Sequence, residues 1–265
     1  MEKTLIIGGG VGPAAGLILH RLVIDNTKAR QDQDFLKTIH MSFSADIPDR
    51  TDSLKAGRPD LPAMGMAASI RAAYSVCRDL NQPAVAGIAC NTFHAGSIWN
   101  LFLEKLEADP LSGPAETGAP GLTILNMIDE TLQSVSESLR PGASIGILST
   151  EGTSAERIYS DPLKEAGFTV LEPDGQKRTH EIIYNREWGL KAHPEVTPEA
   201  GNALKQEARA LAGLGAELII LACTELPLVL PEKTFRGIPL LNPMEVLARA
   251  LVNEAAPEKL LKVRL

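Results

Sequence analysis

Two segments of this chain share one pattern, in which an apolar run ends in Ala-Cys and small polar residues follow at once. The first is Val85–Thr92, which contains Cys90, and the second is Leu218–Glu225, which contains Cys223. A short apolar run bounded in this way indicates a buried strand of a parallel sheet. The cysteines are 133 positions apart (223 − 90), about half of the 265 residues, so the sequence predicts two similar lobes with a cleft between them.

Each of the two cysteines is expected where a parallel strand ends and the next helix begins. Ligands of open α/β sheets bind at that edge, and helix N-termini stabilise thiolates. Two thiols that flank one carbon can move a proton from one face to the other, so the repeated context favours a catalytic pair. A single unpaired cysteine is more often a small apolar filler. That role is predicted for Cys77, which lies in the helical stretch 62–81.

Strand and helix patterns alternate along the chain, which is typical of parallel α/β layers. Short strands are predicted at 4–8 and 169–171, a loop at 44–59, a linker at 109–121 and one helix at 153–166. The predicted fold class is therefore α/β. The lobes are expected to comprise 1–112 with 229–265 for the N-terminal lobe, and 113–228 for the C-terminal lobe.

The composition argues for a small-molecule partner. Apolar residues make up 44% and charged residues 22% of the chain, as in ordinary globular proteins. The net charge of −7 and the lack of a Lys/Arg cluster argue against nucleic-acid binding. Three cysteines cannot pair completely and have no zinc-site spacing, so reduced thiols and no metal are expected. Without a signal-peptide pattern or an apolar run of about 20 residues, a cytoplasmic location and no membrane contact are expected.

A glycine-rich turn follows the first predicted strand, and it contains a Gly-x-Gly-x-x-Ala match that begins at Gly10. Such a match is typical of dinucleotide-binding sites and would indicate a dehydrogenase. The acidic residue that would bind ribose is missing from the end of the second strand, since the first acid after that strand is Asp46. The turn is better suited to hold a small anion, such as a carboxylate, on its backbone N–H groups.

Four motifs together resemble the aspartate/glutamate racemase superfamily, and within it the aspartate racemase branch. They are the Gly-Gly-x-Gly-Pro turn, Ile-Pro-Asp-Arg-Thr at 47–51, Cys-Asn-Thr-x-His at 90–94 and Ala-Cys-Thr-Glu-Leu-Pro-Leu at 222–228. The resemblance implies two pseudo-symmetric, Rossmann-like lobes with parallel sheets and an interlobe active-site cleft. It also implies racemisation by two bases without a cofactor, and a homodimer. It makes Cys90 and Cys223 the bases, and it associates Arg50 and Lys191 with the substrate's side-chain carboxylate.

The chemistry of racemisation explains these residue types. Without a pyridoxal cofactor, a carbanion-like transition state must be stabilised by fixed hydrogen-bond donors and cations. One cysteine, as thiolate, removes the α-proton while the other, as thiol, delivers one. The sulfurs should then lie roughly 7–10 Å apart. Side chains and backbone N–H groups after each cysteine are expected to hold the α-carboxylate. The expected substrate-binding residues, for a dicarboxylic amino acid, are Gly10, Arg50, Asn91, Thr92, Lys191, Thr224 and Glu225.

The supporting residues also have simpler interpretations. Arg50 could pair with an acid of its own loop, Lys191 could be solvated, and Asn91 with Thr92 could serve as a helix cap. His94 is expected to be hydrogen-bonded or solvated rather than catalytic.

The chain departs from related patterns at a few positions. Glu225 stands where the glutamate racemase branch has a His, and the glycine turn lacks the Asp-Ser of that branch. Asn242 stands where an acidic residue is expected. The aspartate racemase branch therefore fits best. A hydantoin racemase, a maleate isomerase and a non-catalytic amino-acid-binding protein stay open as alternatives, whereas an arylmalonate decarboxylase is disfavoured because both cysteines are present.

Overall fold

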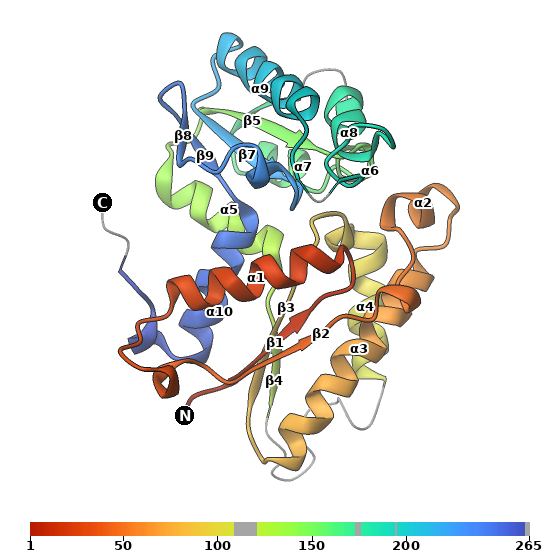
Figure 1. Ribbon diagram of the computed structural model, residues 1–265, viewed down its shortest axis with the longest axis vertical. Helices are drawn as coiled ribbons and strands as arrows, with labels where there is room; N and C mark the ends of the chain where they lie inside the picture. The colour runs from red at the N-terminus through yellow and green to blue at the C-terminus, as the bar shows by residue number, and fades with distance from the viewer. Residues whose placement is uncertain (109–120, 173–175, 194, 263–265) are drawn as a thin grey trace. The chain divides into compact units, whose positions relative to one another are not determined.

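A computed structural model of the chain describes residues 1–108, 121–172, 176–193 and 195–262 (Figure 1). The chain divides into two compact units, Met1–Glu130 with Met244–Leu265, and Thr131–Pro243. Each unit contains its own sheet of mainly parallel strands. The predicted α/β fold with two parallel sheets is confirmed. Among the described residues, no helix combines the length and the apolar character that crossing a membrane requires.

The first unit is built on the sheet β2-β1-β3-β4, whose strands are all parallel. Strands β1 (Thr4–Gly8) and β3 (Ala84–Ile88) are buried along their whole length, because helices cover both faces of the sheet. One face carries α1 (Pro13–Asn26) and α10 (Pro243–Ala255), and the other carries α3 (Asp60–Asp79) and α4 (Gly96–Glu107) (Figure 1). The core beneath α1 and α10 includes Leu5, Ile7, Leu19, Val85, Leu247 and Leu251.

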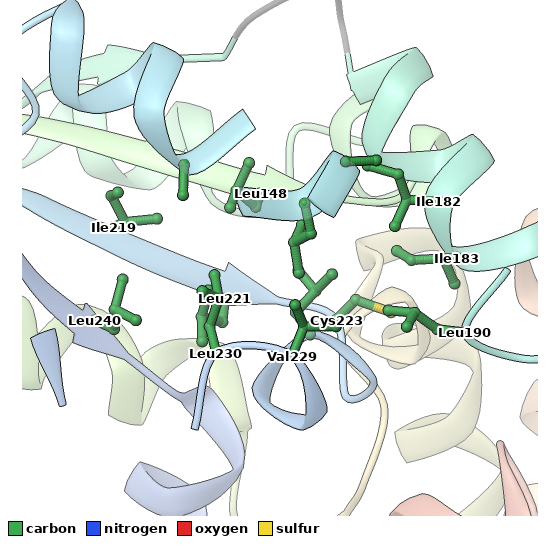
Figure 2. Close-up of a cluster of buried hydrophobic side chains, with 14 of the residues drawn as sticks. Leu148, Ile182, Ile183, Leu190, Ile219, Leu221, Cys223, Val229, Leu230 and Leu240 are labelled. Carbon is green, nitrogen blue, oxygen red and sulfur yellow. The ribbon is translucent and has the colours of Figure 1, made fainter. Parts of the chain in front are cut away.

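The second unit is built on the sheet β6-β5-β7-β9-β8. Its strands are parallel except β8, which forms an antiparallel pair with β9. Helices α8 (Lys177–Tyr184) and α9 (Pro198–Gly213) pack on one face, and their apolar side chains form a buried cluster with β5 and β7 (Figure 2). The strands are β5 (Ser144–Ser149), β6 (Thr169–Leu171), β7 (Leu218–Ala222), β8 (Thr234–Phe235) and β9 (Ile238–Leu241).

The two sheets repeat one strand order. In the first four positions β6-β5-β7-β9 corresponds to β2-β1-β3-β4, where β2 is Thr38–Met41 and β4 is Leu122–Ile124. In each sheet the first strand lies between the second and the third, so a topological switch point falls between the first and third strands. Cys90 lies just beyond β3 and Cys223 directly follows β7, at this point of each sheet. The predicted internal repeat is confirmed in the strand order.

The unit boundaries differ from the expected lobe boundaries at 112/113 and 228/229. Residues 112 and 113, with most of the expected linker, lie outside the described residues. Strand β4 pairs with β3, so the chain beyond that linker still belongs to the first unit. The strands β9 and β8 extend the second sheet, so the second unit continues as far as Pro243. Pairing between distant segments therefore sets both boundaries. Helix α5 (Met127–Ser138) follows β4 and helix α10 follows β9, and each carries the chain into the other unit.

Two local predictions are wrong. The expected loop 44–59 contains a 3-10 turn (Ser44–Asp46) and a short helix, α2 (Arg50–Lys55), whose N-cap Asp49 accepts a hydrogen bond from the backbone N–H of Asp52. The expected single helix 153–166 is two helices, α6 (Glu151–Ala155) and α7 (Ser160–Glu165). Between them Arg157 has a φ of 51°, and a left-handed residue cannot continue a right-handed helix.

Candidate active site

Cys90 lies at the switch point of the first sheet, and 8% of its surface is exposed. Its thiol is free of any disulfide bond. Asn91 leads into a 3-10 turn, Thr92–His94, before α4 begins at Gly96. Asn91 and Thr92 are buried beside the cysteine. Asn91 makes no side-chain capping bond to this turn, so the cap interpretation does not account for it.

His94 links the turn after Cys90 to the start of the segment at Met127. Its Nδ1 lies 2.8 Å from the carbonyl oxygen of Cys90, and its Nε2 accepts a hydrogen bond from the backbone N–H of Met127 at 3.3 Å. The ring stacks on Trp99, with centroids 4.6 Å apart. Burial lowers the pKa of His94 to about 4, against the opposing bond to Cys90, so the imidazole is neutral at physiological pH. The expectation that His94 is hydrogen-bonded rather than catalytic agrees with this arrangement.

Arg50 joins the motif at 47–51 to the glycine turn. It is the first residue of α2 and only 6% exposed, and its Nη2 donates to the carbonyl oxygen of Val11 at 2.6 Å while Nη1 donates to that of Pro48 at 3.2 Å. Helix α2 also contacts the Thr92–His94 turn. The loop motif, the glycine turn and the Cys90 turn therefore meet at one edge of the first sheet.

Gly10 occupies a position in this turn that only glycine fills without strain. Its φ is 83°, in the left-handed region, and a Cβ there would lie 2.9 Å from the backbone nitrogen of Phe43 and 3.0 Å from that of Ser44. The turn after β1 and the segment after β2 thus approach each other closely, with Gly10 between them.

Cys223 occupies the equivalent place in the second sheet, at the end of the buried cluster near Leu190 (Figure 2). It is 8% exposed, and its Sγ–H donates a hydrogen bond to Oε2 of Glu225 at 2.9 Å. The hydroxyl of Thr224 donates to the same oxygen, also at 2.9 Å. Burial raises the pKa of the Cys223 thiol well above its usual value, and the Glu225 carboxylate adds to this, while Lys191 opposes it.

Lys191 completes this network from the turn after α8. The backbone N–H of Lys191 donates to the carbonyl oxygen of Ile183 at 3.0 Å, which turns the chain back and brings its side chain over Tyr184. The ammonium Nζ lies 3.9 Å from Oε1 of Glu225, 3.0 Å from the Tyr184 hydroxyl and 4.2 Å from the centroid of that ring. Burial disfavours its charge, but Glu225, Cys223 and Tyr184 outweigh burial and raise its pKa. Lys191 is therefore a paired cation rather than a solvated one.

Gln176 supports the end of β5 next to this site, and sequence reasoning missed it. It is 1% exposed, its Nε2 donates to the carbonyl oxygen of Ile147 at 2.7 Å, and its Oε1 accepts from the N–H of Ser149 at 2.9 Å. Strand β6 pairs with β5 only as far as Gly146. The side-chain amide thus pairs with β5 where β6 no longer does. No local pattern signals such a role for a glutamine.

A family model described as Asp/Glu/Hydantoin racemase matches residues 9–251 of the chain. The chain belongs to this family. The expected enzyme class, an isomerase of the racemase type, is confirmed. In sequence, the racemase is similar to the "Uncharacterized protein in pnlA 3'region" of Pectobacterium carotovorum subsp. carotovorum, at 32% identity over 114 residues, which cover 42% of this chain and 69% of that protein.

Solved structures share the fold of this racemase. Picrophilus torridus aspartate racemase has a TM-score of 0.75 and 24% identity, covering 99% of this chain and 96% of that one. An aspartate racemase homologue from Pyrococcus horikoshii OT3 has a TM-score of 0.64 and 18% identity, covering 97% of this chain and 100% of that one. Glutamate racemase from Francisella tularensis subsp. tularensis, in complex with D-glutamate, has a TM-score of 0.60 and 14% identity, covering 100% of this chain and 85% of that one. At these identities the likeness shows the fold alone.

The expected site residues of the racemase thus fall into two groups, one at each switch point. The first unit gathers Gly10, Arg50, Cys90, Asn91 and Thr92 at the edge of its sheet, and the second gathers Lys191, Cys223, Thr224 and Glu225. The expected cleft between the lobes and the separation of the two sulfurs stay predictions.

Proposed function

We propose that this racemase inverts the α-carbon of aspartate, and of glutamate as a second substrate, with Cys90 and Cys223 as its two bases and without a cofactor. The observation that carries the proposal is the equivalent position of the two cysteines, each just beyond the third strand of a sheet with the same strand order. Both thiols are free and nearly buried, and small polar residues follow both.

The proposed reaction needs one sulfur in each protonation state. A thiolate takes the α-proton from one face of the substrate, and the electron pair left on carbon takes a proton from the thiol on the opposite face. The protonation states of the two cysteines are then exchanged. Backbone N–H groups beside Cys90, with Asn91 and Thr92, would stabilise the charge that develops on the α-carboxylate. Arg50 would recognise the second carboxylate of an acidic amino acid.

The full chain, without added cofactor, should be incubated in deuterated water with L-aspartate, L-glutamate and a panel of neutral amino acids. Loss of optical rotation and entry of deuterium at the α-carbon should be followed together. We expect both signals with aspartate, and their loss in Cys90→Ala and in Cys223→Ala. Cys77→Ala is the matched control, because Cys77 is 1% exposed inside α3 and should keep activity. Retained racemisation in either of the first two variants excludes the two-base reaction.

One observation favours a second candidate, a hydantoin racemase. Lys191 already pairs with Glu225 and Tyr184, which leaves less of its charge for a substrate carboxylate, and hydantoin stands in the family's description. A 5-substituted hydantoin, corrected for its spontaneous racemisation, belongs in the same panel. Turnover of the hydantoin without turnover of aspartate would replace the first candidate with the second.

We also propose that the racemase is a homodimer that works in the cytoplasm. The reaction needs reduced thiols, which a reducing compartment maintains. Light scattering after gel filtration should give twice the mass of one chain. Fractionation of the source cells should find the activity with cytoplasmic markers, and a monomer or an exported enzyme would contradict the respective proposal.

A further inference from the structure

The two cysteines differ in the residues that follow them. Cys90 is followed by the uncharged Asn91 and Thr92, whereas Cys223 is followed by Thr224 and Glu225, and the Cys223 thiol donates a hydrogen bond to Glu225 at 2.9 Å. Both oxygens of Glu225 are engaged, Oε2 by Cys223 and Thr224, and Oε1 by Lys191 at 3.9 Å. The Glu225 side chain is 15% exposed, so the carboxylate is fixed in place close to the thiol.

We propose that Glu225 is a positioning residue that holds Cys223 as the proton-donating thiol in the resting racemase, so that Cys90 is the base that acts first. This inference rests on the proposed two-base function and gives each cysteine its starting role. It also gives Glu225 a role other than binding the substrate.

The geometry supports this assignment in two ways. A carboxylate oxygen can only accept a hydrogen bond, so the contact from Cys223 to Oε2 exists only while the sulfur carries its proton. A thiolate at the same place would face a like charge at contact distance, which disfavours the ionised form. The cation of Lys191 lies beside Oε1, the oxygen that does not contact the sulfur.

The ionisable groups around Cys223 act in opposite directions. Burial raises the pKa of its thiol, Glu225 raises it further, and Lys191 lowers it. Tyr184 contacts Lys191 and helps to keep that side chain charged. Removal of the carboxylate charge should therefore lower the pKa of the Cys223 thiol, although burial still raises it, and removal of the lysine charge should raise that pKa further.

A ratio of rates for the two enantiomers cannot test the inference. Enantiomers have equal free energies in solution, so kcat/KM must be the same in both directions however the resting protons are distributed. The thiol itself must be measured, in the absence of substrate. A full-length chain with Cys77→Ala and Cys90→Ala keeps Cys223 as its only thiol, since the sequence has three cysteines.

Alkylation of this chain by iodoacetamide, followed by mass spectrometry as a function of pH, reports the thiolate fraction of Cys223. Glu225→Gln keeps the shape and the acceptor oxygen but removes the charge, so we expect roughly tenfold faster alkylation near neutral pH and a midpoint at lower pH. Glu217→Gln is the matched control. It removes the same charge next to the other end of β7, where Glu217 accepts from the N–H of Ser144, and it should leave the alkylation profile unchanged.

Lys191→Met is a second test: it should slow alkylation of Cys223 and move the midpoint of the pH profile to higher pH. This variant still tests the inference if Glu225→Gln does not fold, which circular dichroism would show. Equal alkylation profiles for Glu225→Gln and the parent overturn the inference and leave the racemase proposal standing. A shifted profile in a chain whose parent racemises no substrate upholds the role of Glu225 at Cys223 and rejects the proposed function.

Discussion

The Nδ1 of His94 lies 2.8 Å from the carbonyl oxygen of Cys90, and the Nε2 accepts a hydrogen bond from the N–H of Met127. Since Nε2 is an acceptor, the proton of the neutral ring is on Nδ1, which donates to Cys90. Met127 is the first residue of α5, so the imidazole ties the turn after Cys90 to the start of that helix. Protonation of Nε2 would place two donors face to face and break this link.

The stability of the first unit should therefore fall as the pH falls. The folded pKa of His94, about 4, lies below the unfolded value of 6.5, so the unfolded chain binds more protons between these values. The stabilisation is fully present above pH 6.5 and is lost towards pH 4. At about pH 5 we expect the titration of His94 to lower the free energy of unfolding by about 2 kcal/mol relative to neutral pH. Denaturation followed by Trp99 fluorescence, in a Trp188→Phe chain, measures the stability of this unit.

His94→Asn is the comparison for this pH dependence. The variant lacks the titrating group. Between neutral pH and about pH 5, its free energy of unfolding should therefore fall by about 2 kcal/mol less than that of the parent. Parallel pH profiles for the variant and the parent would show that His94 does not control the acid sensitivity.

Arg50→Lys should separate substrate recognition from support of the glycine turn. Lysine keeps the charge but cannot reach two separated acceptors as the guanidinium does at Val11 and Pro48. If Arg50 also binds the side-chain carboxylate, kcat/KM for aspartate should fall about tenfold or more, because bonds to charged groups contribute about 1.5–3 kcal/mol.

Asparagine is the matched substrate for this variant, because it has the shape of aspartate without the side-chain charge. Racemisation of asparagine, measured by deuterium entry, should fall much less than that of aspartate. An equal fall for both substrates would mean that Arg50 only supports the glycine turn.

Gly10→Ala should weaken both the fold and the activity. A left-handed φ costs an alanine about 1–2 kcal/mol, and the new Cβ would press on the backbone nitrogens of Phe43 and Ser44. We expect the free energy of unfolding, followed by Trp99 fluorescence, to fall by about 2 kcal/mol or more. Racemisation should fall at least about tenfold because the turn shifts. Gly96→Ala is the control in the same unit, because its Cβ would meet no atom within 4 Å. Equal stability of the two variants would contradict the strain at Gly10.

The repeated strands were predictable because their signal is local. Strands β1 and β6 have the bounds that the sequence predicts, and the apolar runs before Cys90 and Cys223 are buried β3 and β7. A parallel strand that is covered on both faces must be apolar throughout, so a short continuous run identifies it. The positions of both cysteines at strand ends follow from this pattern.

The features that were missed depend on contacts between distant residues. Helix α2 has only six residues amid loop-forming residues, so local patterns do not distinguish it from a loop. The link from His94 to Met127 spans 33 positions, and Lys191 reaches Glu225 over 34 (225 − 191). Sequence patterns placed His94 and Glu225 close to the cysteines, and the family resemblance pointed to Lys191, but neither could assign their partners.

Gln176→Leu should destabilise the second unit more than any exposed substitution of the same kind. Leucine has a similar size but leaves the carbonyl oxygen of Ile147 and the N–H of Ser149 buried and unpaired at the end of β5. At about 1–3 kcal/mol for each of the two lost partners, we expect the free energy of unfolding to fall by roughly 2–6 kcal/mol, measured by Trp188 fluorescence in a Trp99→Phe chain. Hydrogen exchange at the Ser149 amide should accelerate. Gln133→Leu, on the exposed face of α5, removes a bond to Glu137 and should cost less than about 0.5 kcal/mol. If both variants unfold alike, the amide of Gln176 does not replace a strand at this edge.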